Sequence, residues 1–170
     1  MIGLWLLFEI GINIYQGILM VYFINRVTVA RKHSFFIDGA TVFFITLFLS
    51  LYLFFDMPFI DTFVFVLPLI HAFIVSPEKW FLKIFWGIAL AALFIGTITL
   101  VSNACIQILN VSWDIIIGEN QFRIVYVLIC NLCLLLVLFI VSKLCSHHTI
   151  ISWKTFSVFI IQLILQSASI

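Results

Sequence analysis

Three polar side chains stand on one side of the first apolar stretch of the sequence. Glu9, Asn13 and Gln16 are four and three residues apart, so a helix places them on one face. A carboxylate among apolar residues is costly unless it has a partner, so such groups face a neighbouring helix or a water-filled cavity. Two interpretations stay open for these residues: hydrogen bonds between helices, and the floor of a ligand pocket.

The fourth apolar stretch carries a second polar stripe, which includes Asn103 and Gln107. If it faces the first stripe, the two enclose a polar cavity that opens outward. The connections at that side are acidic, and Asp61 belongs to them. An acidic rim over a polar floor favours a neutral or cationic ligand with apolar groups. The candidate ligand-binding residues are therefore Glu9, Asn13, Asn103, Gln107 and Asp61.

The histidine and cysteine residues lack the neighbouring side chains that catalysis or metal binding needs. His71 follows Pro68 by three residues, and no second histidine or carboxylate stands at helical spacing to share a metal. A hydrogen-bonded packing role is therefore favoured over a role as a ligand or a proton relay. Cys130 and Cys133 form a C-x-x-C inside an apolar stretch, where thiols act as small hydrophobic groups. A Cys105–His71 protease pair lacks a third, orienting residue. We expect no catalytic residue, no metal site, no cofactor and no enzyme activity.

The composition identifies the surroundings of these side chains. Of 170 residues, 65% are hydrophobic and 9% charged, and the mean hydropathy is +1.33. Soluble domains average about 45–50% apolar and about 25% charged residues. The chain is thus an integral membrane protein, which excludes secreted and disordered classes, and a net charge of +1 gives no general attraction for nucleic acid.

Charged and turn residues divide the chain into six apolar stretches, each near the roughly 20 residues that a transmembrane helix needs. They show no alternation of period two, so a barrel is disfavoured. We predict an all-α polytopic bundle of about six transmembrane helices in one membrane-embedded domain, residues 1–170. The expected helices are 4–24, 35–55, 57–76, 81–109, 122–142 and 155–170.

The third stretch is short between Asp61 and Pro77, so it either spans from about residue 57 or is re-entrant. If all six stretches span, connections 25–34, 77–83 and 143–154 share one side and hold seven of the eight basic residues. The positive-inside rule then places the N-terminus outside and these connections in the cytoplasm. The chain ends directly after its last apolar stretch, and we expect it to be a fragment of a longer protein.

The first stretch also resembles a known family. It opens with Leu7-Phe8-Glu9-Ile10 and closes with Tyr22-Phe23-Ile24-Asn25-Arg26. This pattern is similar to the first helix of peptide-sensing bacterial histidine kinases with a GHKL-type ATPase domain, the group that includes the accessory-gene-regulator quorum receptors. The resemblance implies a two-component sensor in the bacterial cytoplasmic membrane that binds an extracellular peptide and signals to a kinase. The kinase half is missing from this chain.

Expected partners are the lipid bilayer, an extracellular peptide and a second copy of the chain, with no nucleic acid. Two other classes of protein stay open. One is the six-helix substrate-binding subunit of a small-molecule uptake transporter. The other is a small membrane enzyme, such as a thiol oxidase or a peptidase.

Overall fold

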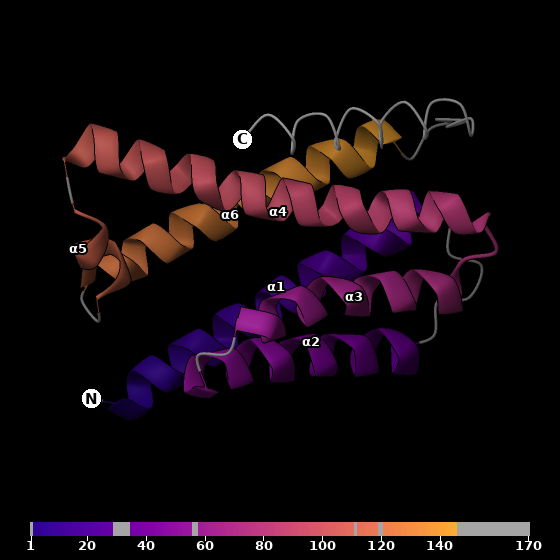
Figure 1. The fold of residues 1–170 in the computed structure, drawn as a ribbon, viewed down its shortest axis with the longest axis horizontal. Helices are drawn as coiled ribbons and strands as arrows, with labels where there is room; N and C mark the ends of the chain where they lie inside the picture. The colour runs from indigo at the N-terminus through magenta and orange to yellow at the C-terminus, as the bar shows by residue number, and fades with distance from the viewer. Residues whose placement is uncertain (1, 29–34, 56–57, 111, 119–120, 146–170) are drawn as a thin grey trace.

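The computed structural model describes residues 2–28, 35–55, 58–110, 112–118 and 121–145 (Figure 1). Within these ranges the chain forms six α-helices and no strand, which confirms the predicted all-α class. The sixth predicted helix, 155–170, lies outside the described residues. The helices are α1 Ile2–Val27, α2 Phe35–Phe55, α3 Pro58–Val75, α4 Trp80–Leu109, α5 Trp113–Ile117 and α6 Gln121–Cys145.

Five of these helices are long, and they run alternately in opposite directions (Figure 1). One end of the bundle holds the start of α1 together with α5, and we call it the N-terminal end. The opposite end holds four of the five described basic residues, Arg26, Lys79, Lys83 and Lys143, and we call it the basic end. The N-terminal end holds Arg123. The described residues therefore show the charge segregation that the sequence indicates.

Helix α3 is continuous although it contains Pro68. Its 18 residues span about 27 Å at about 1.5 Å per residue, close to the thickness of a hydrocarbon core. It lies beside α2 and runs antiparallel to it, toward the basic end of the bundle (Figure 1). Its apolar stretch Phe63–Val75 is shorter than a full span, so the spanning and the re-entrant interpretations of this segment both stay predictions.

The connection between α4 and α6 differs from the prediction. Helix α4 ends at Asn110, which adopts a left-handed conformation with φ of 51°. Asparagine tolerates this region better than most residues, and it commonly ends helices. The five-residue helix α5 follows before the chain turns back into α6. Sequence periodicity did not reveal α5 because a helix of this length carries less than two turns of pattern.

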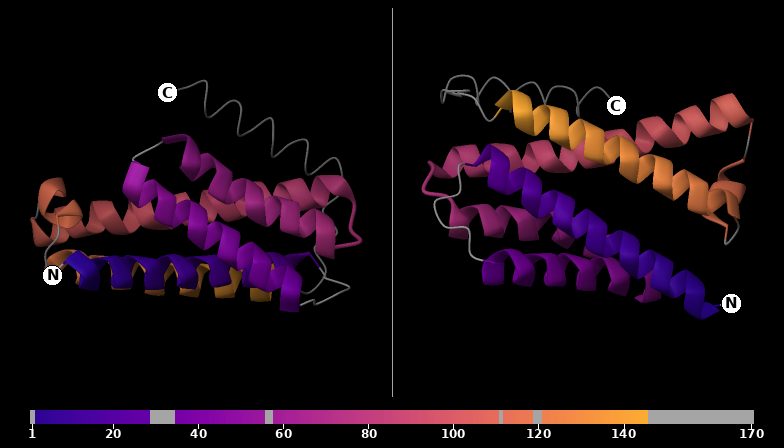
Figure 2. Two further views of the ribbon diagram at one scale, coloured as in Figure 1. Left: turned by 90° about the horizontal axis from the view of Figure 1, so that it is seen from below. Right: turned by 180° about the vertical axis from the view of Figure 1, so that it is seen from behind.

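Helix α1 occupies the middle of the bundle and contacts α2, α3, α4 and α6. Figure 2 shows it between α6 on one side and α2 with α3 on the other. Its second half carries most of its buried apolar residues, and there it joins the core shared by the long helices. The core members with at most 1% exposure are Met20, Phe23, Ile24, Ile45, Ala72, Leu90, Leu134 and Leu138.

Two glycines allow close helix approaches. A Cβ atom at Gly17 would lie 3.3 Å from the carbonyl oxygen of Val42, so the backbones of α1 and α2 nearly touch there. A Cβ at Gly87 would lie 3.1 Å from the Leu69 side chain, where α4 meets α3. Gly96 would meet nothing within 4 Å. Small residues let helix backbones approach in this way in membranes, where packing drives association.

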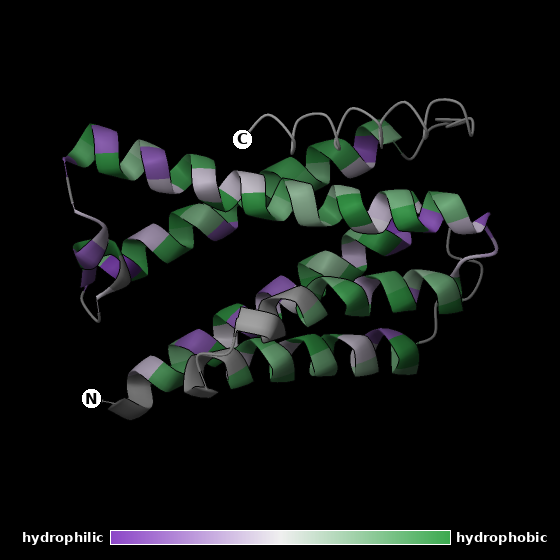
Figure 3. Ribbon diagram, in the orientation of Figure 1, coloured by the Kyte–Doolittle hydropathy of each residue, from purple (hydrophilic) through white to green (hydrophobic). Residues whose placement is uncertain are grey.

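Large apolar side chains cover the outside of the bundle. Phe36 is 86%, Leu100 72% and Ile108 80% exposed. Monomers in water rarely expose apolar patches larger than a few hundred Å², so this surface suits contact with lipid. Figure 3 shows that α2 and α3 are hydrophobic over most of their length, whereas hydrophilic residues recur along α1.

By length and composition, fewer helices qualify as membrane spans than the six expected from sequence. Three described stretches are long and apolar enough: Trp5–Val27, Trp80–Leu109 and Gln121–Cys145. Helices α2 and α3 contribute the shorter apolar stretches Phe35–Leu51 and Phe63–Val75. The fold is thus a helical membrane bundle.

We expect the two ends of the bundle to face opposite sides of the membrane. Lys79 lies at the basic end and Ser112 at the N-terminal end, and both are exposed. In a variant whose four native cysteines are replaced, Lys79→Cys should react with a membrane-impermeant thiol reagent only from the cytoplasm, and Ser112→Cys only from outside. Labelling of both positions from one side of intact cells would contradict this orientation.

Candidate functional site

The carboxylate of Glu9 forms an ion pair with an arginine. Arg123 of α6 donates to Glu9 Oε1 over 2.5 Å, and the guanidinium also lies over the Trp5 ring at 5.8 Å from its centroid. Both charged side chains are mostly buried, with 24% of Arg123 and 16% of Glu9 exposed. An arginine–carboxylate bond in partly dry surroundings is stronger than a neutral hydrogen bond. This pair joins α1 to α6 at the N-terminal end.

The next polar residues of α1 hydrogen-bond to two different helices. Asn13 is buried, and its Nδ2 donates to Ser50 Oγ of α2 over 3.2 Å. Gln16 donates through Nε2 to Asn131 Oδ1 of α6, also over 3.2 Å. These contacts favour the interpretation of the α1 stripe as hydrogen bonds between helices.

The polar stripe of α4 does not join the α1 stripe. Asn103 and Gln107 are exposed. The second half of α4 lies apart from the start of α1, and α6 lies between them in Figures 1 and 2. The side chain of Asp61 lies outside the described part of the structure. The cavity with a shared polar floor is therefore not formed by Glu9, Asn13, Asn103 and Gln107 in this arrangement, and their role in ligand binding stays a prediction.

A small polar cluster lies between α4 and α6. The hydroxyls of Ser102 and Tyr126 are 2.6 Å apart, and Tyr126 also interacts with the Cys130 thiol. A cavity of about 130 Å³ beside them is lined by Tyr126, Cys130 and Asn131 of α6 and by Gln16 of α1. Sequence reasoning missed Tyr126, because a tyrosine in an apolar stretch looks like a packing residue until its hydroxyl partner is known.

The cysteines do not form a reactive centre with His71. All four are free; Cys105 and Cys130 are buried. Cys105 lies near the C-terminal end of α4 and His71 near the C-terminal end of α3, so the antiparallel helices place them at opposite ends of the bundle. In the part of the chain that the structure describes, no group of three His, Cys, Asp or Glu side chains could hold a metal ion. The described residues form a small helical fold without a recognisable catalytic domain.

His71 lies in a polar cluster that joins three helices at the basic end. The side chain is completely buried. Its Nδ1 lies 3.0 Å from Thr41 Oγ1 of α2, and its Nε2 lies 2.9 Å from Asn25 Oδ1 of α1 and 3.3 Å from Asp38 Oδ1 of α2. The prediction of a hydrogen-bonded histidine is confirmed. Asp38, the charged member, escaped sequence reasoning because it stands at the edge of its apolar stretch.

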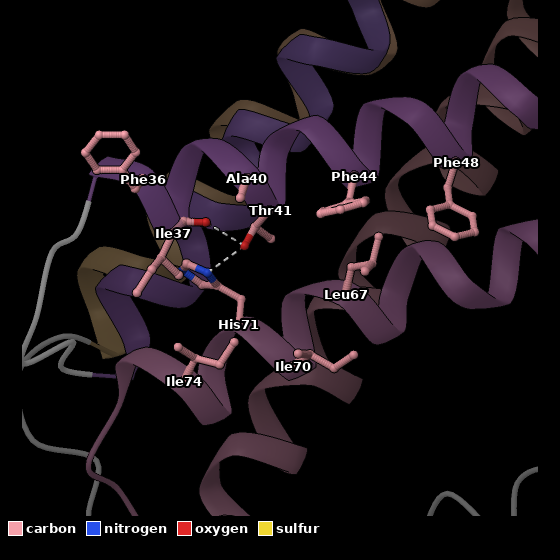
Figure 4. A pocket seen from close by; sticks show the side chains of 10 residues that line it. All are labelled: Phe36, Ile37, Ala40, Thr41, Phe44, Phe48, Leu67, Ile70, His71 and Ile74. Atoms are coloured by element: carbon pink, nitrogen blue, oxygen red, sulfur yellow. Dashed lines mark hydrogen bonds between the residues drawn. The ribbon is translucent and has the colours of Figure 1, made fainter.

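An apolar groove opens beside this cluster between α2 and α3 (Figure 4). Its volume is about 610 Å³, and His71 and Thr41 are the polar side chains that line it. The remaining walls are aliphatic and aromatic, as Phe44, Phe48 and Ile70 illustrate in Figure 4.

Polar side chains also close the helix ends nearby. Ser76 Oγ donates to the carbonyl oxygen of Thr28, and Lys83 Nζ donates to the carbonyl oxygen of Ser76, both over 2.7 Å. A cation beside these carbonyls at the C-terminal end of α3 is favoured by the helix dipole. Glu78 lies in the α3–α4 connection; burial raises the pKa of its carboxyl, and the Lys83 ammonium offsets part of that rise. These hydrogen bonds join the ends of α1 and α3 to the start of α4 and stabilise the basic end of the bundle.

The chain matches no family model, no curated protein and no solved structure.

Proposed function

We propose that the chain is the membrane-embedded sensor domain of a bacterial two-component histidine kinase, which binds an extracellular peptide and relays the event through its helices. The observation that carries the proposal is the set of polar contacts along α1. From the N-terminal end to the basic end, α1 is tied to α6 through Glu9, to α2 through Asn13, again to α6 through Gln16, and to α3 through Asn25.

This arrangement suits a relay. A helix is stiff along its axis, so a shift of about 1–2 Å at one end reaches contacts at the other end. Each of these contacts is a single hydrogen bond or ion pair, so a shift of α1 along its axis either preserves the contact or replaces it with another. The resemblance of the first helix to that of peptide-sensing kinases supports the same function.

The Glu9–Arg123 pair is the contact at which the signal would act. A cationic group of a bound peptide competes with Arg123 for the Glu9 carboxylate, and apolar side chains of the peptide would contact the apolar surface around Trp5. Of the neutral or cationic ligands expected from the sequence, the cationic ones fit this competition.

Spin labels at the basic end test the relay. With labels on Lys79→Cys and Leu144→Cys in the cysteine-free protein, Arg123→Gln should shift the label-to-label distance by about 1–2 Å or more. The peptide fraction of spent medium from the source cells should cause a similar shift, and Glu9→Gln should reduce that response. Asp114→Asn, an exposed position of α5 at the N-terminal end, is the matched control. Unchanged distances in Arg123→Gln would argue against a sensor.

A further inference from the structure

The hydrogen-bonding partners of His71 determine which ring nitrogen carries hydrogen. At Nε2, the imidazole faces Asn25 Oδ1 at 2.9 Å and Asp38 Oδ1 at 3.3 Å. A carboxylate oxygen can only accept, and so can an amide oxygen. Nε2 therefore holds a hydrogen whether the ring is neutral or charged.

At Nδ1 the partner is a hydroxyl, which can act in either direction. Thr41 Oγ1 lies 3.0 Å from Nδ1 and 2.9 Å from the carbonyl oxygen of Ile37 one turn earlier in α2 (Figure 4). When Nδ1 is bare, the hydroxyl donates its hydrogen to Nδ1. When Nδ1 is protonated, the hydroxyl turns to Ile37 and accepts from the ring. Both states keep a hydrogen bond at Nδ1 without movement of the heavier atoms.

The charge of the protonated ring also has a counterpart. Asp38 Oδ1 is buried and accepts no hydrogen bond from the described residues, while 27% of the Asp38 side chain is exposed. A desolvated carboxylate oxygen is stabilised by a positive charge at 3.3 Å. Asp38 stands in the first turn of α2, at the basic end of the bundle, and its exposed part would be the route by which a proton reaches the buried ring.

Other charged groups near this end face elsewhere. On α1, Arg26 lies over the Tyr22 ring at 5.9 Å and is exposed. At the start of α4, Lys83 points to the carbonyl oxygens of Ser76 and Phe73, and it balances Glu78. Arg31, Lys32 and His33 lie outside the described residues. Within the described part, Asp38 is thus the charged group that faces the imidazole.

We propose that His71 Nδ1 is a reversible proton-binding site, with Asp38 as its counter-charge and Thr41 as the hydroxyl that changes direction with protonation. Proton uptake adds an ion pair between α2 and α3, so the proton acts as a chemical input at the basic end. The proposal goes beyond the proposed sensor function and does not depend on it, because the site needs no peptide ligand.

Nitrogen NMR of the ¹⁵N-histidine-labelled full chain in lipid nanodiscs tests this site directly. The signals of His71 are those lost in His71→Gln. They should change reversibly between a neutral ring, with hydrogen on Nε2, and an imidazolium between about pH 5 and about pH 8. Asp38→Asn should lower the proton affinity of the ring at least about tenfold, because it removes the counter-charge. Asp114→Asn, at the opposite end of the bundle, should leave the titration unchanged.

Three results would overturn the proposal. The first is a neutral ring with its hydrogen on Nδ1. In that case Asn25 would donate from its amide nitrogen to a bare Nε2, and Nδ1 could not take up a proton. A ring that stays in one protonation state across this pH range would make His71 a fixed structural residue. An unchanged affinity in folded Asp38→Asn would exclude the carboxylate as counter-charge. The first two are read from the unaltered protein, so they hold even if Asp38→Asn does not fold.

Discussion

Gly17→Leu should destabilise the bundle by about 3 kcal/mol or more, which lowers the midpoint of thermal unfolding by roughly 10 °C. The reason is the close approach of α1 and α2. A Cβ atom alone would already lie 3.3 Å from the Val42 carbonyl oxygen, and backbone cannot yield as a flexible side chain does. The added branches of leucine would force the two helices apart along the length where α1 joins the core.

The buried cysteines report this unfolding. Cys105 and Cys130 are protected in the folded bundle and react with a fluorogenic thiol dye when it opens. Gly11→Leu is the matched control, because Gly11 lies on the same helix and a Cβ there would meet nothing within 4 Å. It should leave the midpoint within about 2 °C of the unaltered protein. Equal midpoints for the two variants would show that α1 and α2 do not approach closely at Gly17.

Arg123→Gln should destabilise the bundle by about 1.5–3 kcal/mol, because it leaves the mostly buried Glu9 carboxylate without its counter-charge. The double variant Glu9→Gln with Arg123→Gln removes both charges and leaves two groups that can hydrogen-bond as neutral amides. It should therefore be more stable than Arg123→Gln alone. The same thiol-dye unfolding measurement checks the series, with Asp114→Asn as an exposed control at the same end.

The comparison of single and double variants separates two explanations. If Arg123 stabilises the bundle chiefly through its packing on Trp5, the double variant will be as unstable as Arg123→Gln, since neither retains the guanidinium. That outcome would contradict a stabilising role for the ion pair. Recovery in the double variant supports it.

The positions of the long helices could be predicted closely from the sequence. The structure has α2 at Phe35–Phe55, as expected, and α4 begins at Trp80 where 81 was predicted. Long apolar stretches interrupted by charged and turn residues carry this information locally, because hydrocarbon requires each backbone group to bond within its own helix. The short α5 carries no such signal.

The partners of the polar residues could not be predicted in the same way. Periodicity places Glu9, Asn13 and Gln16 on one broad face, but it does not tell which neighbour that face meets. In the bundle, neighbouring members of the stripe reach different helices, and Asn103 and Gln107 of α4 stay exposed because the α4 and α1 ends diverge. Arg123 offered one clue, as the basic residue on the otherwise acidic side of the predicted topology.

The contacts of α1 have a consequence for the synthesis of the protein. The partners of Glu9 and Gln16 are 114 and 115 residues further along the chain, in α6, whereas the partner of Asn13 is only 37 residues away. A ribosome adds about 5–20 residues per second, so the first helix waits several seconds with a carboxylate and an amide unmatched. During this interval α1 is less hydrophobic than α2, α3 and α4, and two of its polar side chains lack their partners. We therefore expect the translocon or an insertion chaperone to retain α1 until α6 has been synthesised.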